Sequence, residues 1–488
     1  MSMSKQVLSL ALALSSWLSS AHAGAHFAPC EDAGTSPSLT GSLCATVTLP
    51  LSYAAAEAHA EPGQQLSIFL RKIPAAGRAR GTVWLIAGGP GESGASLYPF
   101  VAILQRSFPG FDLIIPDHRG TGRSTRLCPR EEAVDSPGGT ALSGAEWGTC
   151  FGRLNDQPAL SRQFSISNAA RDLNALLHQE EDGRPTYLYG VSYGTQLVLR
   201  TLQIGKSAVA GVILDSLVPL ETDEQSDLSH RSQLVDAVGR QFLAECDARP
   251  DCFKILGRPA EAAYRELLAL AAERPELLSE VPGRNLPQFF GTLLDIPSLR
   301  ALIPVLIQDL RAGRKEALHS SLNQLREVEA FLLAYPHSPP SIPLVTIISG
   351  AENNLRPDLT EAALQREDQD RLFKSALPAM LLRPALPLYA RDEYFGGQAA
   401  ALPPTLVFQG TLDPKTSYQA ALAHVARLRQ AAKSIGVVSV TGAPHFVLWT
   451  APACFERRAR DFIDGLRPED SRCELTGTEL GAASAGAQ

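Results

Sequence analysis

Four short apolar runs, bounded by glycine, proline or charged residues, constrain the fold of this chain more than any other feature. They cover residues 82–87, 111–116, 186–189 and 209–215. Continuous apolar runs of this length are typical of strands that are buried on both faces of a sheet. Stretches with helical spacing of apolar residues lie between the runs. Strands that alternate with helices predict an α/β fold, in which a mostly parallel sheet is covered by helices on both faces.

A long helix-rich segment interrupts this alternation. It is more polar than its surroundings and carries proline-marked breaks, and buried-strand patterns return only at residues 404–410 and 436–440. Two earlier segments, at residues 44–50 and 66–71, alternate well enough to form an antiparallel edge of the sheet. The predicted organisation is a signal peptide at 1–23, a core in two parts at 24–219 and 403–475, a helical cap at 220–402, and a disordered tail at 476–488.

The first 23 residues have the features of a signal peptide. A start that carries Lys5 precedes an apolar run at residues 7–18, and Ala21-His22-Ala23 provides a cleavage site before Gly24. The run is too short to span a bilayer comfortably, and no later segment supplies about 18 unbroken apolar residues. An uncleaved N-terminal anchor is the alternative. We expect an exported protein, periplasmic or secreted, without a stable membrane span.

The charge of the chain bears on its partners, and the cysteines bear on its compartment. A formal net charge of −7 and the absence of a dense Lys/Arg cluster argue against a nucleic-acid partner. Eight cysteines are an even set, and disulfides are the default in an oxidising compartment. About a hundred pairings are possible in principle. Pairing of sequence neighbours would join Cys30 with Cys44, Cys128 with Cys150, Cys246 with Cys252, and Cys454 with Cys473.

A metal site is the alternative use of these cysteines. The chain has no C-x-x-C pair and no cluster of histidines, so the usual zinc-ligand spacings are missing. We therefore expect no metal and no other cofactor.

One serine lies at the apex of a predicted strand, turn and helix. The segment Gly190-Val191-Ser192-Tyr193-Gly194 follows the run at 186–189 and precedes a helical pattern. A nucleophile elbow needs this context, because its central residue adopts a strained backbone and its neighbours at two residues' distance must lack bulk. The pattern favours Ser192 as a nucleophile; a solvated or helix-capping serine is the alternative.

A serine hydroxyl is a poor nucleophile unless a base removes its proton and an acid orients that base. Asp413 follows the predicted strand at 404–410, and His445 follows the strand at 436–440. The order Ser192, Asp413, His445 is the order of hydrolases that use a nucleophile elbow. A turn aspartate before proline and a partly buried loop histidine are the alternatives for these two residues.

The oxyanion of such a reaction needs backbone N–H donors, and a glycine-rich turn follows the strand at 82–87. The N–H groups of Gly89 and of Tyr193, the residue after the nucleophile, are the predicted donors. A phosphate-binding loop is the competing interpretation, but the Lys-Ser/Thr of a P-loop and the spacing of a dinucleotide fingerprint are absent.

Four motifs together resemble the α/β-hydrolases of the prolyl and tripeptidyl aminopeptidase type. They are AGGPGESG at residues 87–94, DHRGTGRS at 117–124, GVSYG at 190–194 and GTLDP at 410–414. The resemblance extends over most of the chain and is weakest across the insertion. It implies an α/β-hydrolase fold with a cap between the sixth and seventh strands, an acyl-enzyme, and release of residues from a free peptide N-terminus. It implies a structural role for residues 117–124.

Two departures from the family bear on specificity. Ala87 stands where many relatives have histidine, which changes the polar surroundings of the oxyanion donors. Cap glutamates of the family hold the substrate's α-ammonium, and the matching segment here makes Glu352 the candidate amine anchor, with an exposed surface carboxylate as the alternative. The predicted substrate is therefore a small peptide. An esterase or amidase with the same triad, and a hydrolase fold used only for binding, are the alternative functions.

Overall fold

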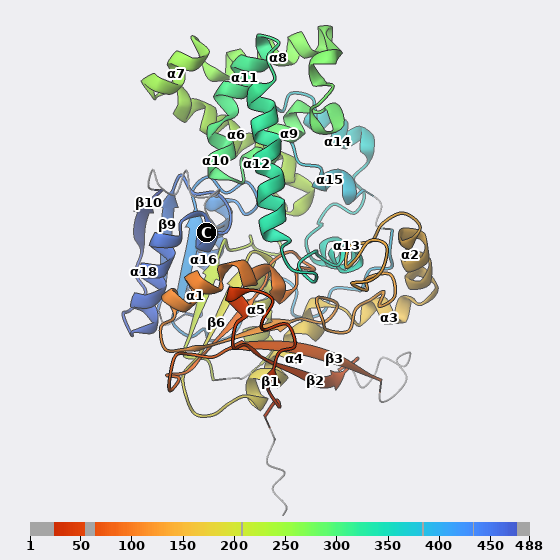
Figure 1. Cartoon of the computed structure of the whole chain (residues 1–488), viewed down its shortest axis with the longest axis vertical. Coiled ribbons are helices and arrows are strands. Elements are labelled where there is room, and N and C mark those ends of the chain that lie inside the picture. The colour runs from red at the N-terminus through yellow and green to blue at the C-terminus, as the bar shows by residue number, and fades with distance from the viewer. Residues whose placement is uncertain (1–23, 54–63, 206–207, 383–384, 433, 476–488) are drawn as a thin grey trace, which may run out of the picture.

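The buried runs form the centre of one mixed sheet in the computed structural model, which describes residues 24–53, 64–205, 208–382, 385–432 and 434–475 (Figure 1). The predicted signal peptide and tail lie outside the described residues. The strands are β1 (Ala28–Pro29), β2 (Leu43–Pro50), β3 (Gln65–Ile73), β4 (Thr82–Ile86), β5 (Asp112–Asp117), β6 (Thr186–Val191), β7 (Gly211–Asp215), β8 (Thr405–Gly410), β9 (Ile435–Thr441) and β10 (Ser471–Glu474).

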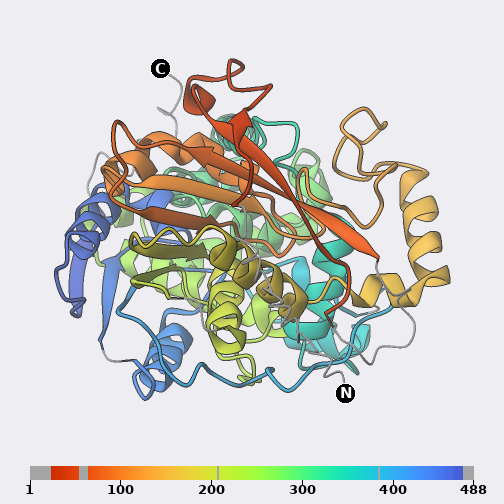
Figure 2. The same cartoon turned by 90° about the horizontal axis from the view of Figure 1, so that it is seen from below.

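The order of the strands in the sheet is β1-β2-β3-β5-β4-β6-β7-β8-β9-β10. The pairs β1–β2, β2–β3 and β3–β5 are antiparallel, and the pairs from β5–β4 to β9–β10 are parallel. The long N-terminal strands cross the molecule in the view of Figure 2, and the blue C-terminal elements lie at one side. The antiparallel edge and the parallel centre are those that the sequence patterns predict.

Helices cover both faces of this sheet because the central strands bury both of their faces. In β4, Trp84 and Ile86 pack with α4 (Ile166–Gln179), α5 (Tyr193–Ile204) and α16 (Tyr418–Leu428). Val83 and Leu85 point to the other face, which is covered by α1 (Val101–Ser107), α17 (Val447–Thr450) and α18 (Pro452–Ile463). The alternation of side chains along a strand thus divides one apolar run between two cores.

A helical insertion separates β7 from β8 and stands above the sheet in Figure 1. Counted from β2, these are the sixth and seventh strands. The α-helices of the insertion are α6 (Arg231–Asp247), α7 (Pro250–Leu256), α8 (Ala260–Glu273), α9 (Leu286–Leu293), α10 (Pro297–Ala301), α11 (Ile303–Arg311), α12 (Glu316–Leu332), α13 (Ile342–Glu352), α14 (Glu361–Asp368) and α15 (Leu377–Met380). Helices α6 to α12 enclose their own apolar core.

Shorter elements complete the fold. They are α2 (Glu146–Asp156), α3 (Pro158–Arg162) and the 3₁₀ helices η1 (Pro37–Leu39), η2 (Gly94–Phe100), η3 (Leu228–His230), η4 (Pro275–Leu278) and η5 (Pro282–Arg284). Among the described helices, none combines the length and the hydropathy that a bilayer crossing requires.

Two details differ from the sequence patterns. The stretch with helical spacing between the first two apolar runs begins as the 3₁₀ helix η2, which contains Pro99, and becomes α-helical only from Val101. Strand β10 was not predicted, because its sequence contains no apolar run. It pairs with β9 along the sheet edge, and a disulfide ties its Cys473 to Cys454 of α18.

The structure contains four disulfides, and each joins sequence neighbours. The pairs are Cys30–Cys44, Cys128–Cys150, Cys246–Cys252 and Cys454–Cys473. Three of them lie in the α/β core and one, between α6 and α7, lies in the helical insertion. No described cysteine is free.

Candidate active site

Ser192 lies at a sharp turn between β6 and α5, with a backbone that L-residues rarely adopt (φ 53°, ψ −124°). The two flanking glycines make this turn possible. A side chain at Gly190 would collide with the carbonyl of Gly194, and a Cβ at Gly194 would lie 2.5 Å from the carbonyl oxygen of Ile86. The glycine requirement that the sequence pattern implies thus has a direct steric cause.

Asp413 and His445 come together at the carboxyl ends of β8 and β9. The Nδ1–H of His445 donates to Asp413 Oδ2 at 2.8 Å. Because a carboxylate can only accept, this bond places the ring proton on Nδ1 and leaves Nε2 free to accept a proton. Both side chains are buried.

Asp413 is held as a carboxylate by its neighbours. Its Oδ1 accepts the N–H groups of Lys415 (2.7 Å) and Thr416 (2.8 Å), and its Oδ2 accepts the Thr416 hydroxyl at 2.6 Å. Burial acts to raise the pKa of Asp413, but the attraction of His445 and these hydrogen bonds outweigh it, so the pKa is lowered.

The loop that carries His445 is anchored to the end of β7. The Ser216 hydroxyl accepts the N–H of Phe446 at 2.8 Å. The buried carboxylate of Asp215 accepts the N–H groups of Val447 and Leu448, both at 2.9 Å. These bonds fix the backbone on the C-terminal side of His445 and therefore the position of its ring.

A cavity of about 490 Å³ joins Ser192 and His445 beneath the helical insertion. Its apolar lining comes from both parts of the chain and includes Val218, Val345 and Trp449. No hydrogen bond joins the Ser192 hydroxyl to His445 within the described residues. Such bonds are often long in enzymes without substrate and tighten in the complex.

Two backbone N–H groups beside Ser192 lack partners. Neither Gly89 nor Tyr193 donates its N–H to an acceptor in the described part of the chain, and both residues line the cavity. Gly89 has a φ of 108°, where a Cβ would lie 2.8 Å from the nitrogen of Gly91. The glycine therefore permits the tight turn, and α13 closes over it, since Ser341 donates its N–H to the Gly91 carbonyl at 2.9 Å.

The segment 117–124 stabilises the glycine-rich turn after β4 through hydrogen bonds. Asp117 is buried and accepts the N–H groups of Gly94 (2.8 Å) and Arg123 (2.7 Å). Arg119 is also buried and forms a two-bond ion pair with Asp172 of α4, at 2.6 and 2.7 Å. These contacts connect the glycine-rich turn to the sheet and to α4 and do not reach the cavity.

Glu352, at the end of α13, is buried at 2% exposure and lines the same cavity as Ser192. It is therefore not the exposed carboxylate of the alternative interpretation. Its Oε2 lies 3.4 Å from Nη2 of Arg200, which also forms a two-bond ion pair with Glu221 at 2.8 and 3.0 Å. Burial raises the pKa of Glu352 to about 7; Arg200 acts against this shift and Glu221 adds to it.

Six charged residues of the cavity were not singled out by the sequence patterns. Two of them are Asp227 and Asp295, and the remaining four are Glu92, Glu221, Arg231 and Lys415. Glu92 belongs to the glycine-rich motif, but only the fold of that turn brings its carboxyl group to Ser192: a Cβ on Gly88 would lie 3.3 Å from Glu92 Oε2 and 3.3 Å from Ser192 Cβ. Burial raises the pKa of Glu92. The other three are isolated charges in the sequence, without a motif.

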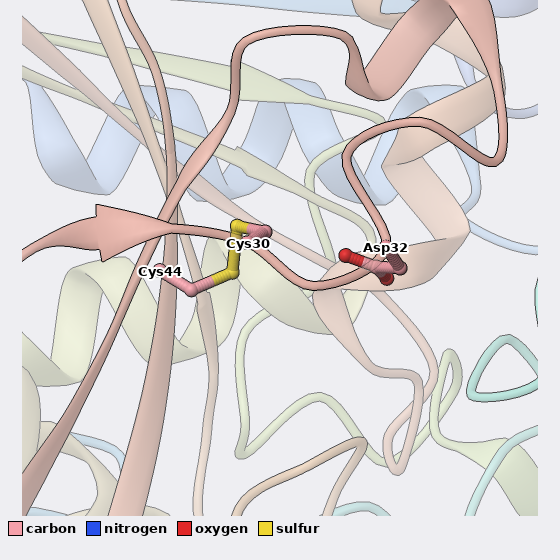
Figure 3. Close-up of side chains that lie close together, drawn as sticks. All are labelled: Cys30, Asp32 and Cys44. Atoms are coloured by element: carbon pink, nitrogen blue, oxygen red, sulfur yellow. A yellow bond between two sulfur atoms is a disulfide. The ribbon is translucent and has the colours of Figure 1, made fainter.

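One group of potential metal ligands occurs among the described residues, at Cys30, Asp32 and Cys44 (Figure 3). The two sulfur atoms form a disulfide and are not thiolates. The Asp32 carboxylate accepts two bonds of 2.7 Å from Arg71 and one of 2.7 Å from Arg123. The group is thus a disulfide beside an ion pair, and its atoms are committed to those contacts.

Comparison with known proteins matches two regions of the chain to protein families. Residues 81–296 match the alpha/beta hydrolase fold family, and residues 384–473 match the family described as TAP-like protein. The serine protease Hip1 of Mycobacterium bovis is 23% identical over 492 aligned positions, which cover 91% of this chain and 90% of that protein, and Hip1 of Mycobacterium tuberculosis matches equally.

Solved structures that the comparison matches to this chain include a lipase in its open form and a laboratory-evolved variant of potato epoxide hydrolase. The lipase is 14% identical, with a TM-score of 0.38 and coverage of 86% of this chain and 98% of its own. The epoxide hydrolase variant is 16% identical, with a TM-score of 0.37 and coverage of 82% and 97%.

Proposed function

We propose that this chain, a serine hydrolase of the prolyl and tripeptidyl aminopeptidase type within the α/β-hydrolases, is an exported aminopeptidase that uses Ser192, Asp413 and His445. The observation that carries the proposal is a cavity that contains a strained serine, a histidine bound to a carboxylate, and a buried acidic group. A serine hydrolase needs the first two, and recognition of a free amino end needs the third.

The proposed reaction begins when Ser192 Oγ attacks the carbonyl carbon of the scissile bond. His445 Nε2 takes the serine proton, while Asp413 stabilises the resulting imidazolium through Nδ1. The N–H groups of Gly89 and Tyr193 bind the oxyanion of the tetrahedral intermediate. When the C–N bond breaks, His445 gives its proton to the leaving amine and an ester remains on Ser192. A water molecule, deprotonated by His445, then hydrolyses that ester and restores the serine.

The charges around Arg200 support a role for Glu352 in amine binding. Two cavity carboxylates, Glu352 and Glu221, share this one guanidinium with a third carboxylate, Asp392, so the group carries excess negative charge when its carboxylates are ionised. Burial is the main cause of the raised pKa of Glu352, and the charge of Glu221 adds to it; a substrate ammonium would neutralise the excess charge. A free amino end therefore gains a charged partner that a blocked amino end lacks.

Export is part of the proposal. A predicted signal peptide precedes the described residues, and the four disulfides suit an oxidising compartment.

The assay that tests this function compares peptide anilides with free and with blocked amino ends, alongside short and long acyl esters. An aminopeptidase cleaves the free-amine anilides with a kcat/KM well above that of the blocked ones. Equal rates on both, or turnover of esters alone, would reject it.

Esterase activity on small molecules is the second candidate function. The observation that favours it is the apolar lining of the cavity, which includes Leu220, Leu228 and Phe446 and could hold an acyl chain. In that case Glu352 would have no influence on the choice of substrate. The ester arm of the same assay distinguishes the two.

A further inference from the structure

The cavity has a second charged region, and it is cationic. Arg231, the first residue of α6, and Lys415, in the turn after β8, both line the cavity with Ser192. Arg231 forms no hydrogen bond and no ion pair with any residue that the structure describes. Arg231 is partly exposed, so the five N–H donors of its guanidinium are available to a ligand in the cavity.

The side chain of Arg231 is available to an anionic ligand, since it faces the cavity and pairs with no described carboxylate. Burial lowers the pKa of its guanidinium, against the attraction of the Asp413 and Asp295 carboxylates, which lie too far away for an ion pair. Asp413 is already saturated by its bonds to His445 and Thr416. An anion from outside the chain would satisfy Arg231 without disturbing that arrangement.

Arg231 has no direct counter-ion among the described residues. Lys415 pairs with Asp295 Oδ2, whereas Arg231 is attracted by Asp295 and Asp413 without an ion pair to either. Asp227 also lines the cavity, but its carboxylate accepts from Ser229, from His230 and from the Leu355 N–H. Burial raises the pKa of the Glu92 carboxyl group, and the nearby positive charge of Lys415 acts against this shift.

The cationic residues lie where the leaving group of the proposed reaction must be. His445 has to protonate the leaving amine, so the rest of the leaving group extends from the His445 side of the cavity. Lys415 is two residues after Asp413, the partner of His445, and the charge of Arg231 acts on Asp413. The acidic pair is held from a different element, because Glu352 and Glu221 pair with Arg200 of α5, the helix that begins directly after Ser192.

We propose that Arg231, together with Lys415, binds the terminal carboxylate of the leaving fragment, so that the enzyme is selective for short peptides with both ends free. This inference rests on the proposed aminopeptidase function and specifies its substrate class. A cavity of about 490 Å³ lies within the range of roughly 300–1,000 Å³ that encloses small ligands. A short zwitterionic peptide places an ammonium at the acidic end and a carboxylate at the cationic end.

The test measures kcat/KM for matched peptides of two to four residues that differ only in a C-terminal carboxylate or carboxamide. The expected preference of the wild-type protein for the free acid is roughly ten- to hundredfold, the size of a charge-assisted hydrogen bond. In Arg231→Met the ratio of acid to amide should fall close to one, and Arg231→Lys should restore part of it. Arg265→Met, which removes an exposed arginine of α8, is the control and should keep the wild-type ratio.

The outcomes separate this inference from the function on which it rests. Cleavage of free-amine peptides with equal rates for acid and amide overturns the carboxylate site and leaves the aminopeptidase intact. Failure to cleave any free-amine peptide, with esters turned over, overturns both. A second pair of matched peptides, both C-terminal amides, carries Glu or Gln directly after the scissile bond. Preference for the Glu side chain without preference for a free terminus overturns the assignment to the terminal carboxylate. The ratio of kcat/KM for acid over amide in the wild-type protein tests the proposal by itself. The test therefore does not depend on whether the Arg231 variants fold.

Discussion

Replacement of Glu352 by glutamine tests the link between the acidic end of the cavity and the choice of substrate. The substitution preserves size and removes one negative charge from a residue that is 2% exposed. A hydrogen bond to a charged group contributes roughly 1.5–3 kcal/mol. Since about 1.4 kcal/mol corresponds to a factor of ten, kcat/KM for free-amine peptides should fall by roughly 10- to 150-fold, mostly through KM.

The pH dependence adds a second signature to this prediction. The pKa of Glu352 is raised to about 7, so the carboxylate that binds an ammonium predominates only above that pH. The substrate ammonium has a pKa of roughly 8 and is lost above it. The ratio of kcat/KM for free over blocked peptides should therefore rise with pH through about 7 and decline above about 8. In Glu352→Gln the rise should be absent.

The ratio of kcat/KM for free over blocked peptides is the appropriate quantity because both substrates would react through Ser192 and His445. Any pH dependence of that shared chemistry cancels in the ratio. Glu361→Gln, in the exposed first turn of α14, is the matched control and should reproduce the wild-type profile. A Glu352→Gln variant with wild-type discrimination and an unchanged pH profile would refute the amine anchor, and the buried carboxylate would then serve only to balance Arg200.

Three further predictions concern the elbow and the histidine loop. Ser192→Ala should lower kcat by roughly 10⁴-fold or more, and residual turnover close to wild type in the anilide assay would contradict the nucleophile. Gly194→Ala places a Cβ 2.5 Å from the Ile86 carbonyl, so urea titration should show a loss of about 1–3 kcal/mol or more; an unchanged midpoint would count against the steric argument. Ser216→Ala deprives the Phe446 N–H of its acceptor, so kcat should fall several-fold with little change in KM, whereas a pure KM effect would point to a role in binding.

The sheet, its antiparallel edge and the strand-end positions of the proposed triad could be predicted from sequence because each depends on local patterns. Ser192 follows a buried strand and lies between two glycines that the backbone requires, and Asp413 and His445 each follow a further buried strand. The carboxyl ends of neighbouring parallel strands meet at one edge of a sheet, so chain order alone brings such residues close together. Strand β10 escaped prediction because its pairing, and not its composition, makes it a strand.

The charged ends of the cavity had no comparable signal. Nothing near Glu352 in the chain indicates that Arg200 and Glu221 surround it, since the ion pairs join α13 to α5 and to the segment after β7. Glu352 itself was a candidate only through the family resemblance. Arg231 is one arginine among many in the sequence, and only its lack of a partner beside the cavity distinguishes it.

By itself, the sequence determined the α/β framework and the position of Ser192 at a turn, because steric limits and apolar periodicity act over a few residues. The tertiary structure alone decided which charges face that serine. Burial, shared counter-ions and unpaired donors depend on which segments pack together across hundreds of residues. The proposed choice of substrate therefore rests on features that no local pattern encodes: the contact of Glu352 with Arg200, and an Arg231 that pairs with no residue in the described part of the chain.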